Sequence, residues 1–296
     1  MTPPTPLVAT RRIGALTVHA IQAGGTRLDG GAMFGVVPKT LWEKRIPADD
    51  RNRIPLGMRC LLVEHDGGLV LIDTGAGNKE SEKFHDIYGL ENRGANGRTA
   101  LEDGLRALGY SPDDIALVIN SHLHFDHAGG NTYRDGSGAT MLAFPKARYV
   151  VQRGELEFAS RTNERTAASY FPPNFAPVSA AGRLDLVSGE REIVSGIRVV
   201  PTPGHTPHHQ GILIESAGER AFYLADLVPT IAHLPLPWIM GYDVEPLVTL
   251  ETKRTILARA LREEWLAIFE HDATHAWGRV THDGKAYGFV PEGPAG

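Results

Sequence analysis

Residues 115–127 read Ile-Ala-Leu-Val-Ile-Asn-Ser-His-Leu-His-Phe-Asp-His, an apolar run that leads straight into a cluster of polar side chains. The apolar part, residues 115–119, is typical of a buried β-strand. The cluster brings three imidazoles and a carboxylate together, at His122, His124, Asp126 and His127. Burying such groups costs roughly several kcal/mol unless a partner satisfies them. A metal ion is such a partner, so this stretch predicts a metal site at the end of a strand.

The donor atoms of the cluster indicate which metals suit it. Neutral imidazole and carboxylate favour zinc, iron or manganese over metals that prefer thiolates. The chain has one cysteine, Cys60, within the apolar run of residues 58–63. One cysteine provides neither an intrachain disulfide nor a pair of thiolate ligands, so we interpret Cys60 as a small buried side chain. Zinc is the first expectation, with manganese, iron and cobalt as alternatives.

Composition and charge are those of an ordinary globular protein. Of the 296 residues, 42% are hydrophobic and 22% are charged, which is enough for one large domain. A formal net charge of -5 and the lack of a long basic run argue against nucleic acid as a partner. No apolar stretch approaches the ~18 residues of a membrane helix, and the proline-rich N-terminus lacks the apolar region of a secretory signal. The sequence predicts a cytoplasmic single domain over residues 1–296, with flexible tails at 1–10 and 291–296.

Hydrophobic periodicity predicts alternating strands and helices. Early strands are expected at residues 16–21, 60–63 and 68–72. The turn Asp66-Gly67-Gly68 makes the last two of these a hairpin. A helix is expected from Thr99, because Thr99 and Glu102 form a capping-box pattern, and it should end at Gly109. A second helix is expected at about residues 250–264.

Several strands are expected to end in a candidate ligand. Besides the strand before His122, they are residues 197–200 before His205, 221–224 before Asp226 and 265–269 before His271. In layered α/β proteins, ligands bind where strand ends and their loops converge, so one shared site is expected. His275 is an alternative to His271, but His271 is favoured because it comes sooner after the apolar strand.

These motifs, in this order, resemble the ligand series of the metallo-β-lactamase superfamily. The resemblance rests on His122-x-His124-x-Asp126-His127, Gly204-His205-Thr206, Leu224-Ala225-Asp226 and Glu270-His271-Asp272, with Asp73-Thr74-Gly75 upstream. It extends from about Leu61 to Asp272, which is most of the chain. It implies an α/β fold, a four-layer αββα sandwich with the metals at one edge between two sheets.

The resemblance also implies two divalent metal ions. One would bind His122, His124 and His205, the other would bind Asp126, His127 and His271, and Asp226 would bridge both. Such a pair holds a hydroxide between the metals and polarises a carbonyl or phosphoryl oxygen. Asp126 and Asp226 are the residues expected to take part in catalysis. Asp73 is expected to orient a ligand without touching metal, although it is also suited to capping the turn that it begins.

Within the superfamily, the chain is most similar to the lactonases and organophosphate hydrolases, which include N-acyl homoserine lactone lactonases and methyl parathion hydrolase. The supporting stretches are residues 121–130, 204–207 and 225–230. They imply a hydrolase that opens lactones, as in quorum quenching, or hydrophobic esters by attack of the bridging hydroxide. Well-known homoserine lactone lactonases have a tyrosine three residues after the bridging aspartate, where this chain has Pro229. Candidates to replace it are Tyr223, Tyr242 and His233.

Two apolar loops are candidate walls of a substrate pocket. Residues 28–38 are rich in glycine and apolar side chains, and residues 234–240 form the second loop. The side chains expected to contact a small hydrophobic lactone or ester are Phe34, Trp42, His233 and Trp238. Core packing is the alternative for the first loop, and both loops are also candidates for a homodimer contact.

Other functions share these ligands. They include an organophosphate triesterase, a thiolester hydrolase similar to glyoxalase II, a nuclease and a β-lactamase. The thiolester hydrolase would need basic residues that grip glutathione, and no matching cluster stands out in the sequence. A non-enzymatic domain held together by metal would need a closed ligand shell, whereas this ligand set, spread over two ions, leaves open positions. The favoured prediction is therefore a hydrolase.

Overall fold

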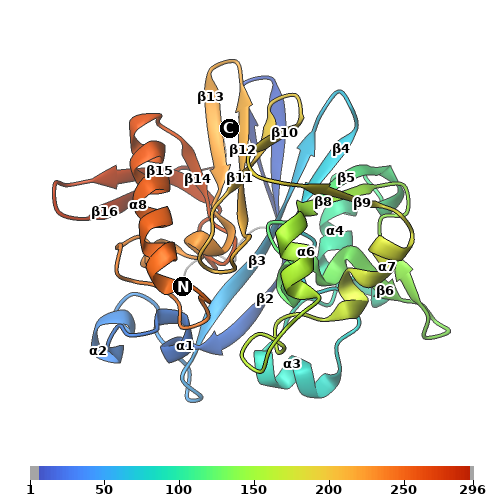
Figure 1. The fold of residues 1–296 in the computed structure, drawn as a ribbon, viewed down its shortest axis with the longest axis horizontal. Helices are drawn as coiled ribbons and strands as arrows, with labels where there is room; N and C mark the ends of the chain where they lie inside the picture. Colours follow the sequence, from blue (N-terminus) through green and yellow to red (C-terminus); the bar gives the residue numbers. More distant parts are fainter. Residues whose placement is uncertain (1–6, 294–296) are drawn as a thin grey trace.

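The structure is a computed structural model that describes residues 7–293. Within these residues, two sheets of seven strands each form the centre of the molecule (Figure 1). The first sheet has the order β1-β2-β3-β4-β5-β8-β9. Its strands are β1 (Val8–Ile13), β2 (Leu16–Asp29), β3 (Arg53–Glu64), β4 (Leu69–Ile72), β5 (Ile115–Ile119), β8 (Arg148–Gln152) and β9 (Leu184–Val187).

The second sheet follows the first in the chain and has its strands in sequence order, from β10 to β16. They are β10 (Arg191–Val194), β11 (Ile197–Pro201), β12 (Gln210–Ser216), β13 (Glu219–Tyr223), β14 (Leu266–Ile268), β15 (Trp277–His282) and β16 (Tyr287–Pro291). A separate hairpin pairs β6 (Thr132–Arg134) with β7 (Thr140–Leu142).

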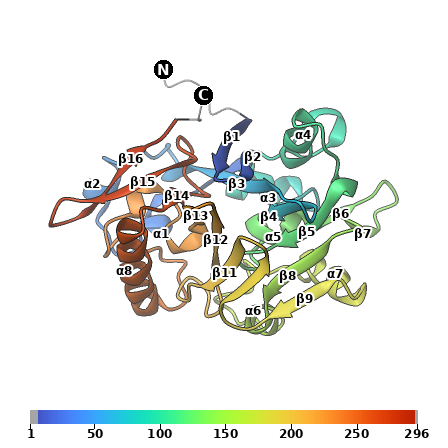
Figure 2. The same cartoon turned by 90° about the horizontal axis from the view of Figure 1, so that it is seen from above.

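Helices cover the outer faces of the two sheets. The α-helices are α1 (Gly30–Phe34), α2 (Lys39–Trp42), α3 (Glu82–Tyr88), α4 (Ala100–Ala107), α5 (Phe125–Ala128), α6 (Arg153–Ala159), α7 (Ala176–Ala180) and α8 (Pro246–Arg262). The 3-10 turns are η1 (Ala95–Gly97), η2 (Pro112–Asp114), η3 (Gly129–Asn131), η4 (Pro172–Asn174), η5 (Ala225–Leu227) and η6 (Ile231–His233). Figure 2 shows α8 on the side of the second sheet and α4 and α7 on the side of the first.

Three hydrophobic clusters define the layers. The largest contains side chains of both sheets, for example Leu117 of β5 and Ile212 of β12, and so lies between them. The outer face of the first sheet packs against Leu105 of α4, and the outer face of the second packs against Leu257 of α8. The predicted αββα sandwich is therefore confirmed.

The strand β5 shows why its sequence is apolar throughout. It pairs in parallel with β4 and β8 in the middle of the first sheet. Leu117 and Ile119 point into the core between the sheets, whereas Ile115 and Val118 point to the helix layer. A parallel strand that is buried on both faces needs apolar residues at consecutive positions.

Parallel pairing also brings the candidate site residues to one edge. The parallel strands β4 and β5 end just before Asp73 and His122. In the second sheet, β13 and β14 are parallel and end before Asp226 and His271. Because the two sheets face each other, these strand ends meet at one edge of the sandwich.

Local predictions can be compared with this structure. The helix expected from Thr99 is α4, and its capping box between Thr99 and Glu102 is present. The expected hairpin is the antiparallel pair β3–β4. The helix expected at residues 250–264 is α8, which begins earlier, with Pro246 at its first turn, where proline is well tolerated.

The ends of the described chain are more ordered than the predicted tails. Residues Val8–Thr10 belong to β1 and pair with His19–Ile21 of β2, and Pro291 is the last residue of β16. These parts of the expected flexible tails are therefore strands, because sheet partners satisfy their backbone groups. The rest of that prediction, at residues 1–6 and 294–296, lies outside the described residues. Among residues 7–293, no helix has the length and apolar character needed to span a membrane.

Candidate metal centre

The segment after β5 delivers four polar side chains to the shared edge. His124 is the N-cap of the short helix α5, and Asp126 and His127 lie in its first turn. All of these side chains, and His122 before them, are buried. A tight helical turn directly after a strand lets neighbouring residues point their side chains towards one point.

The first donor group consists of His122, His124, His205 and Asp226, whose nearest donor atoms all lie within 4.8 Å of one another. His205 Nε2 is 3.0 Å from Asp226 Oδ2 and 3.1 Å from His124 Nδ1. The Nε2 atom of His122 is buried and has no hydrogen-bond partner in the part of the chain that the structure describes. A buried donor atom aimed at three others is what a divalent cation needs.

The second donor group consists of His127, Asp226, Glu270 and His271, again within 4.8 Å of one another. Asp226 Oδ1 lies 3.1 Å from His271 Nε2 and 3.3 Å from His127 Nε2. Asp226 thus belongs to both groups. Asp126 lies nearby, with oxygens 3.7 Å and 3.9 Å from the Nε2 atoms of His271 and His127. The structure brings the side chains of all seven predicted ligands together, and Glu270, which the sequence analysis did not single out, lies among them.

Asp73 lies behind His127. Its carboxylate accepts hydrogen bonds from the backbone N–H and hydroxyl of Ser121, both at 2.7 Å, and from the Tyr223 hydroxyl at 3.2 Å. It also lies 3.0 Å from His127 Nδ1, within hydrogen-bond geometry. If Nδ1 carries the proton of His127, the lone pair of Nε2 faces the donor groups.

Two other candidate ligand histidines are held in the same way. His271 Nδ1 lies 2.8 Å from the carbonyl oxygen of Gly57, and His205 Nδ1 lies 2.9 Å from Asp243 Oδ1. In each case Nε2 is left to face Asp226. His209 contributes differently, because its Nε2 accepts a hydrogen bond from the backbone N–H of Asp226. Fixed ring orientations of this kind prepare imidazoles for metal binding.

Burial and charge determine the protonation of the cluster. Burial holds the pKa of His122 and of His124 well below its ordinary value, so both rings are neutral and able to bind a cation. Burial also acts to lower the pKa of His205 and His271, but Asp226 and neighbouring carboxylates outweigh it and raise both to about 10. A bound cation must displace these protons, so metal affinity falls as the pH falls.

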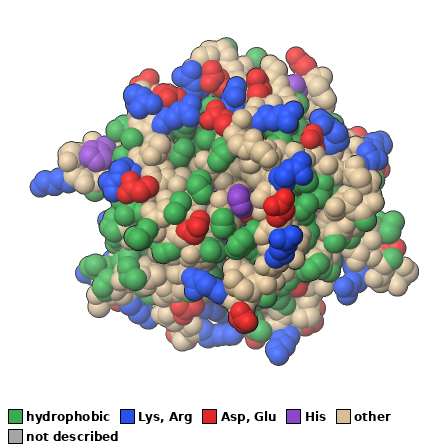
Figure 3. Space-filling model, in the orientation of Figure 1, with side chains coloured by type: hydrophobic (Ala, Val, Ile, Leu, Met, Phe, Trp, Pro, Cys, Tyr) green, Lys and Arg blue, Asp and Glu red, His purple; other side chains and the backbone are tan. Residues whose placement is uncertain are grey.

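A small cavity of about 40 Å³ opens onto the cluster. It is lined by ligands and by residues of the surrounding loops: Leu28, Met33, His124, Phe125, Asp126, Ser169, His205, Asp226, Met240, Tyr242 and His271. The loop with Met240 and Tyr242 leads into α8. On the face of the molecule seen in Figure 3, hydrophobic side chains gather at the lower left. In the same orientation, Figure 1 shows α2 and the lower part of α8 there. The apolar lining residues Leu28, Met33, Phe125 and Met240 favour a partly apolar ligand in the cavity.

The side chains predicted to wall the pocket lie one layer behind it. Phe34 and Trp42 are fully buried in a hydrophobic cluster that Trp238 joins, and Phe34 stacks on His233 with ring centres 4.4 Å apart. His233 Nε2 lies 2.8 Å from the carbonyl oxygen of Met33, so this ring ties the two loops together. Both predicted loops reach the cavity, but through Leu28, Met33 and Met240. Successive residues of a helix point about 100° apart, which separates Met33 from Phe34 in α1.

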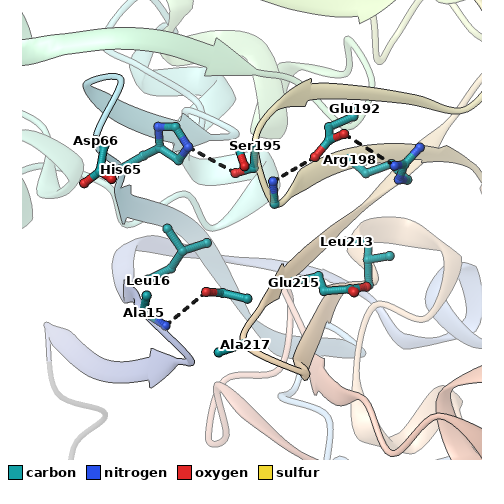
Figure 4. A pocket seen from close by; sticks show the side chains of 12 residues that line it. Ala15, Leu16, His65, Asp66, Glu192, Ser195, Arg198, Leu213, Glu215 and Ala217 are labelled. Carbon is teal, nitrogen blue, oxygen red and sulfur yellow. Dashed lines mark hydrogen bonds and ion pairs between the residues drawn. The ribbon is translucent and has the colours of Figure 1, made fainter.

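A larger cavity, of about 610 Å³, lies away from this centre. Figure 4 shows it among the turns that join β1 to β2, β3 to β4, β10 to β11 and β12 to β13, where His65 Nε2 donates a hydrogen bond to the carbonyl oxygen of Ser195. Glu192, Arg198 and Glu215 are among its lining side chains, and none of the candidate ligands is. Size alone therefore does not identify the functional site here.

Comparison with known proteins agrees with this geometry. The sequence model of the metallo-beta-lactamase superfamily matches residues 55–273. An N-acyl homoserine lactonase from Bacillus cereus is 33% identical over 232 residues, which are 75% of this chain and 83% of that protein. A structural-genomics target from Staphylococcus aureus has 32% identity and a TM-score of 0.86, with 95% of this chain and 98% of that chain covered.

A solved N-acyl homoserine lactone hydrolase is also similar. Its structure holds the product N-hexanoyl-L-homoserine at its catalytic metal center. It is 25% identical, with a TM-score of 0.66 over 90% of this chain and 94% of that chain.

Proposed function

This chain belongs to the metallo-beta-lactamase superfamily, and we propose that within it the protein opens N-acyl homoserine lactones or similar hydrophobic lactones with two divalent metal ions, zinc first among them. The observation that carries the proposal is Asp226, which is shared by two buried donor groups. The similarity to N-acyl homoserine lactonases supports the substrate class. Within residues 7–293, the buried Nε2 atom of His122 has no hydrogen-bond partner, which supports a cation at the first donor group.

Cations held by the two groups supply a bound water of lowered pKa and an electrophile for the carbonyl oxygen of the lactone. Asp226 serves this chemistry by holding three imidazoles in place, since its two oxygens lie 3.0–3.3 Å from the Nε2 atoms of His205, His271 and His127. These contacts keep the donor groups preformed, so little reorganisation is needed during the reaction.

Asp126 is placed for proton transfer. Its carboxylate lines the cavity and lies at the edge of the second donor group. We assign to it the proton released when the water oxygen adds to the carbonyl carbon. The C–O bond of the ring then breaks, and Asp126 passes this proton to the ring oxygen as it leaves as an alkoxide.

The loops around the cavity supply the substrate contacts. Leu28, Met33 and Met240 offer an apolar surface for an acyl chain. Of the tyrosines that could replace the one missing at Pro229, Tyr223 lies beneath the ligands, with its hydroxyl bonded to Asp73 and to the backbone of Arg59. Tyr242 lines the cavity itself, so we assign the contact with the substrate oxygen to its hydroxyl.

Replacing Tyr242 with phenylalanine is expected to lower kcat/KM for lactones by about tenfold, the loss of one hydrogen bond to the transition state. Steady-state kinetics on a homoserine lactone would measure this. A matched control is Tyr133→Phe, since Tyr133 of β6 is as exposed as Tyr242, at 40% against 39%, and does not line this cavity. An unchanged kcat/KM in the Tyr242 variant would remove this residue from substrate binding.

A substrate panel tests the proposed function. Zinc-loaded and chelator-treated protein would be assayed on homoserine lactones with short and long acyl chains, other lactones, paraoxon-like triesters and S-lactoylglutathione. We expect metal-dependent turnover, with homoserine lactones the best substrates and acyl-chain preference set by the apolar walls. Turnover of only the triester or only the thiolester would overturn the substrate assignment while leaving the metal centre in place.

A further inference from the structure

Glu270 is a buried carboxylate for which the proposed mechanism has no role. It lies between the end of β14 and His271, and 0% of its surface is exposed. Among the described residues, neither oxygen of its side chain takes part in a hydrogen bond. Its charge lies within ion-pair distance of the imidazoles of His127 and His271, and when a metal ion makes these rings neutral, the ion itself has to balance that charge.

Orientation of His127 does not account for Glu270. Its Oε2 is 2.8 Å from His127 Nδ1, but only Asp73, at 3.0 Å, meets hydrogen-bond geometry with this nitrogen. When His127 Nε2 binds a metal, the ring keeps one proton, on Nδ1, and Asp73 is in line to accept it. Glu270 is then left with a charge and no donor.

Glu270 also lies close to a nitrogen atom that faces the second donor group. Glu270 Oε2 is 3.7 Å from His271 Nε2, the same nitrogen that lies 3.1 Å from Asp226 Oδ1. One donor atom each from Glu270, His271, Asp226 and His127 falls within 4.8 Å of the others. Asp126 is not part of this tightest group.

Buried Arg59 fixes the backbone that carries Glu270. Its guanidinium donates hydrogen bonds to the carbonyl oxygens of Phe269, Glu270 and Asp272, the last two at 3.4 Å and 3.0 Å. All three bonds go to the backbone, so Arg59 holds residues 269–272 in place without taking the Glu270 carboxylate as an acceptor. The side chain therefore stays directed at the donor group.

We propose that Glu270 is a ligand of the second metal position, together with His127, His271 and Asp226. This inference rests on the two-metal site of the proposed function but not on its substrate. The first group then offers three imidazoles and one carboxylate, whereas the second offers two imidazoles and two carboxylates, with Asp126 beside them. The richer oxygen content makes the second position the better one for manganese or iron(II).

The test is a zinc titration of the metal-free full-length protein against a chromophoric chelator. We expect two zinc ions per wild-type chain. Glu270→Gln keeps the shape of the side chain and removes its charge. It is expected to weaken binding of the second ion by more than about 10²-fold, which exceeds the loss from removing a residue that only orients a ligand, and to leave binding of the first ion unchanged. Asp272→Asn is the matched control, because Asp272 is also buried but accepts backbone hydrogen bonds and belongs to neither donor group.

Thermal melting with and without zinc gives a second readout. Saturating zinc should raise the melting temperature of Glu270→Gln by less than it raises that of the wild type, because the second ion binds the variant more weakly. Metal-free Asp272→Asn should melt below the metal-free wild type, since Asp272 accepts hydrogen bonds from Ile231, Thr274 and His275. If Glu270→Gln does not fold, Glu270→Asp provides the titration, with an intermediate loss of affinity expected.

The possible outcomes are distinguishable. Two zinc ions bound to Glu270→Gln with wild-type affinity would overturn the role of Glu270 alone. One zinc ion bound to the wild type would overturn the two-metal centre and this inference with it. Loss of the second ion in Glu270→Gln, in a wild type that does not hydrolyse lactones, would support the ligand and reject the substrate class.

Discussion

Replacing Asp226 with asparagine is expected to lower kcat/KM for lactone hydrolysis by about 10³-fold or more, because each cation contributes several kcal/mol to the transition state and this residue serves both. An amide cannot balance the charge of two cations, and its NH2 group replaces one of the two oxygens that contact His205, His271 and His127. The measurement pairs steady-state kinetics with zinc content per chain. We expect both to fall together.

The control for this variant is Asp185→Asn. Asp185 of β9 forms an exposed ion pair with Arg148, so the same change of charge should leave kcat/KM and zinc content as in the wild type. Full zinc content and full activity in Asp226→Asn would show that this carboxylate does not join two metals, and the proposed mechanism would then be wrong.

Replacing Lys253 with methionine is expected to lower the free energy of unfolding by about 3 kcal/mol, because hydrogen bonds from a charged donor are lost in the interior. The buried ammonium of Lys253, on α8, donates to the carbonyl oxygens of His233, Pro235 and Trp238 at 2.7–3.0 Å. One side chain thus holds the loop that precedes Met240 and Tyr242. We expect lower kcat/KM for long-chain lactones as well as lower stability, measured by urea unfolding and kinetics.

Burial also makes the contribution of Lys253 to the free energy of unfolding depend on pH. It lowers the pKa of Lys253 to about 7 from an ordinary value of 10.5. Between these values the unfolded chain binds more protons than the folded one, so the contribution of Lys253 to stability rises with pH from about 7 to 10. The methionine variant should lose this slope. Arg254→Met, which removes an exposed cation on the same helix, should keep it and change stability by less than about 0.5 kcal/mol.

The architecture and the ligand positions were accessible from the sequence because they depend on local patterns. The apolar run of residues 115–119 is long enough to identify a strand buried on both faces, and the polar cluster after it has few explanations other than metal. His205, Asp226 and His271 each follow such a run. Strand ends are also where parallel topology converges, so order along the chain was sufficient to predict their meeting.

The residues around the ligands were harder to predict. Asp243 approaches His205 from a loop 38 residues further along, and no local pattern distinguishes it from other loop carboxylates. Glu270 and Arg59 did carry a signal, since each is a charged residue directly beside a buried apolar strand segment or within one. A charge at such a position requires a specific partner, so it marks a candidate site residue.

For the pocket walls, the sequence predicted the loops but not the side chains that point into the cavity. The glycine-rich segment of residues 28–38 and the loop of residues 234–240 do reach the cavity, as their composition indicated. Which side chains point inward depends on the short helix α1, whose register places Met33 at the cavity and Phe34 in the cluster with Trp42. Helices of a single turn leave too little periodicity in the sequence to fix that register.

The residues of each donor group follow strands of both sheets, so metal binding would affect how the two sheets are held together. Two imidazoles of the first group and one of the second come from the segment after β5, and they meet side chains that follow strands of the second sheet. A cation at either position is therefore a cross-link between the two halves of the sandwich, and its binding free energy adds to that of the folded state. If the proposed metals bind, removing them from the purified protein is expected to lower its melting temperature as well as its activity.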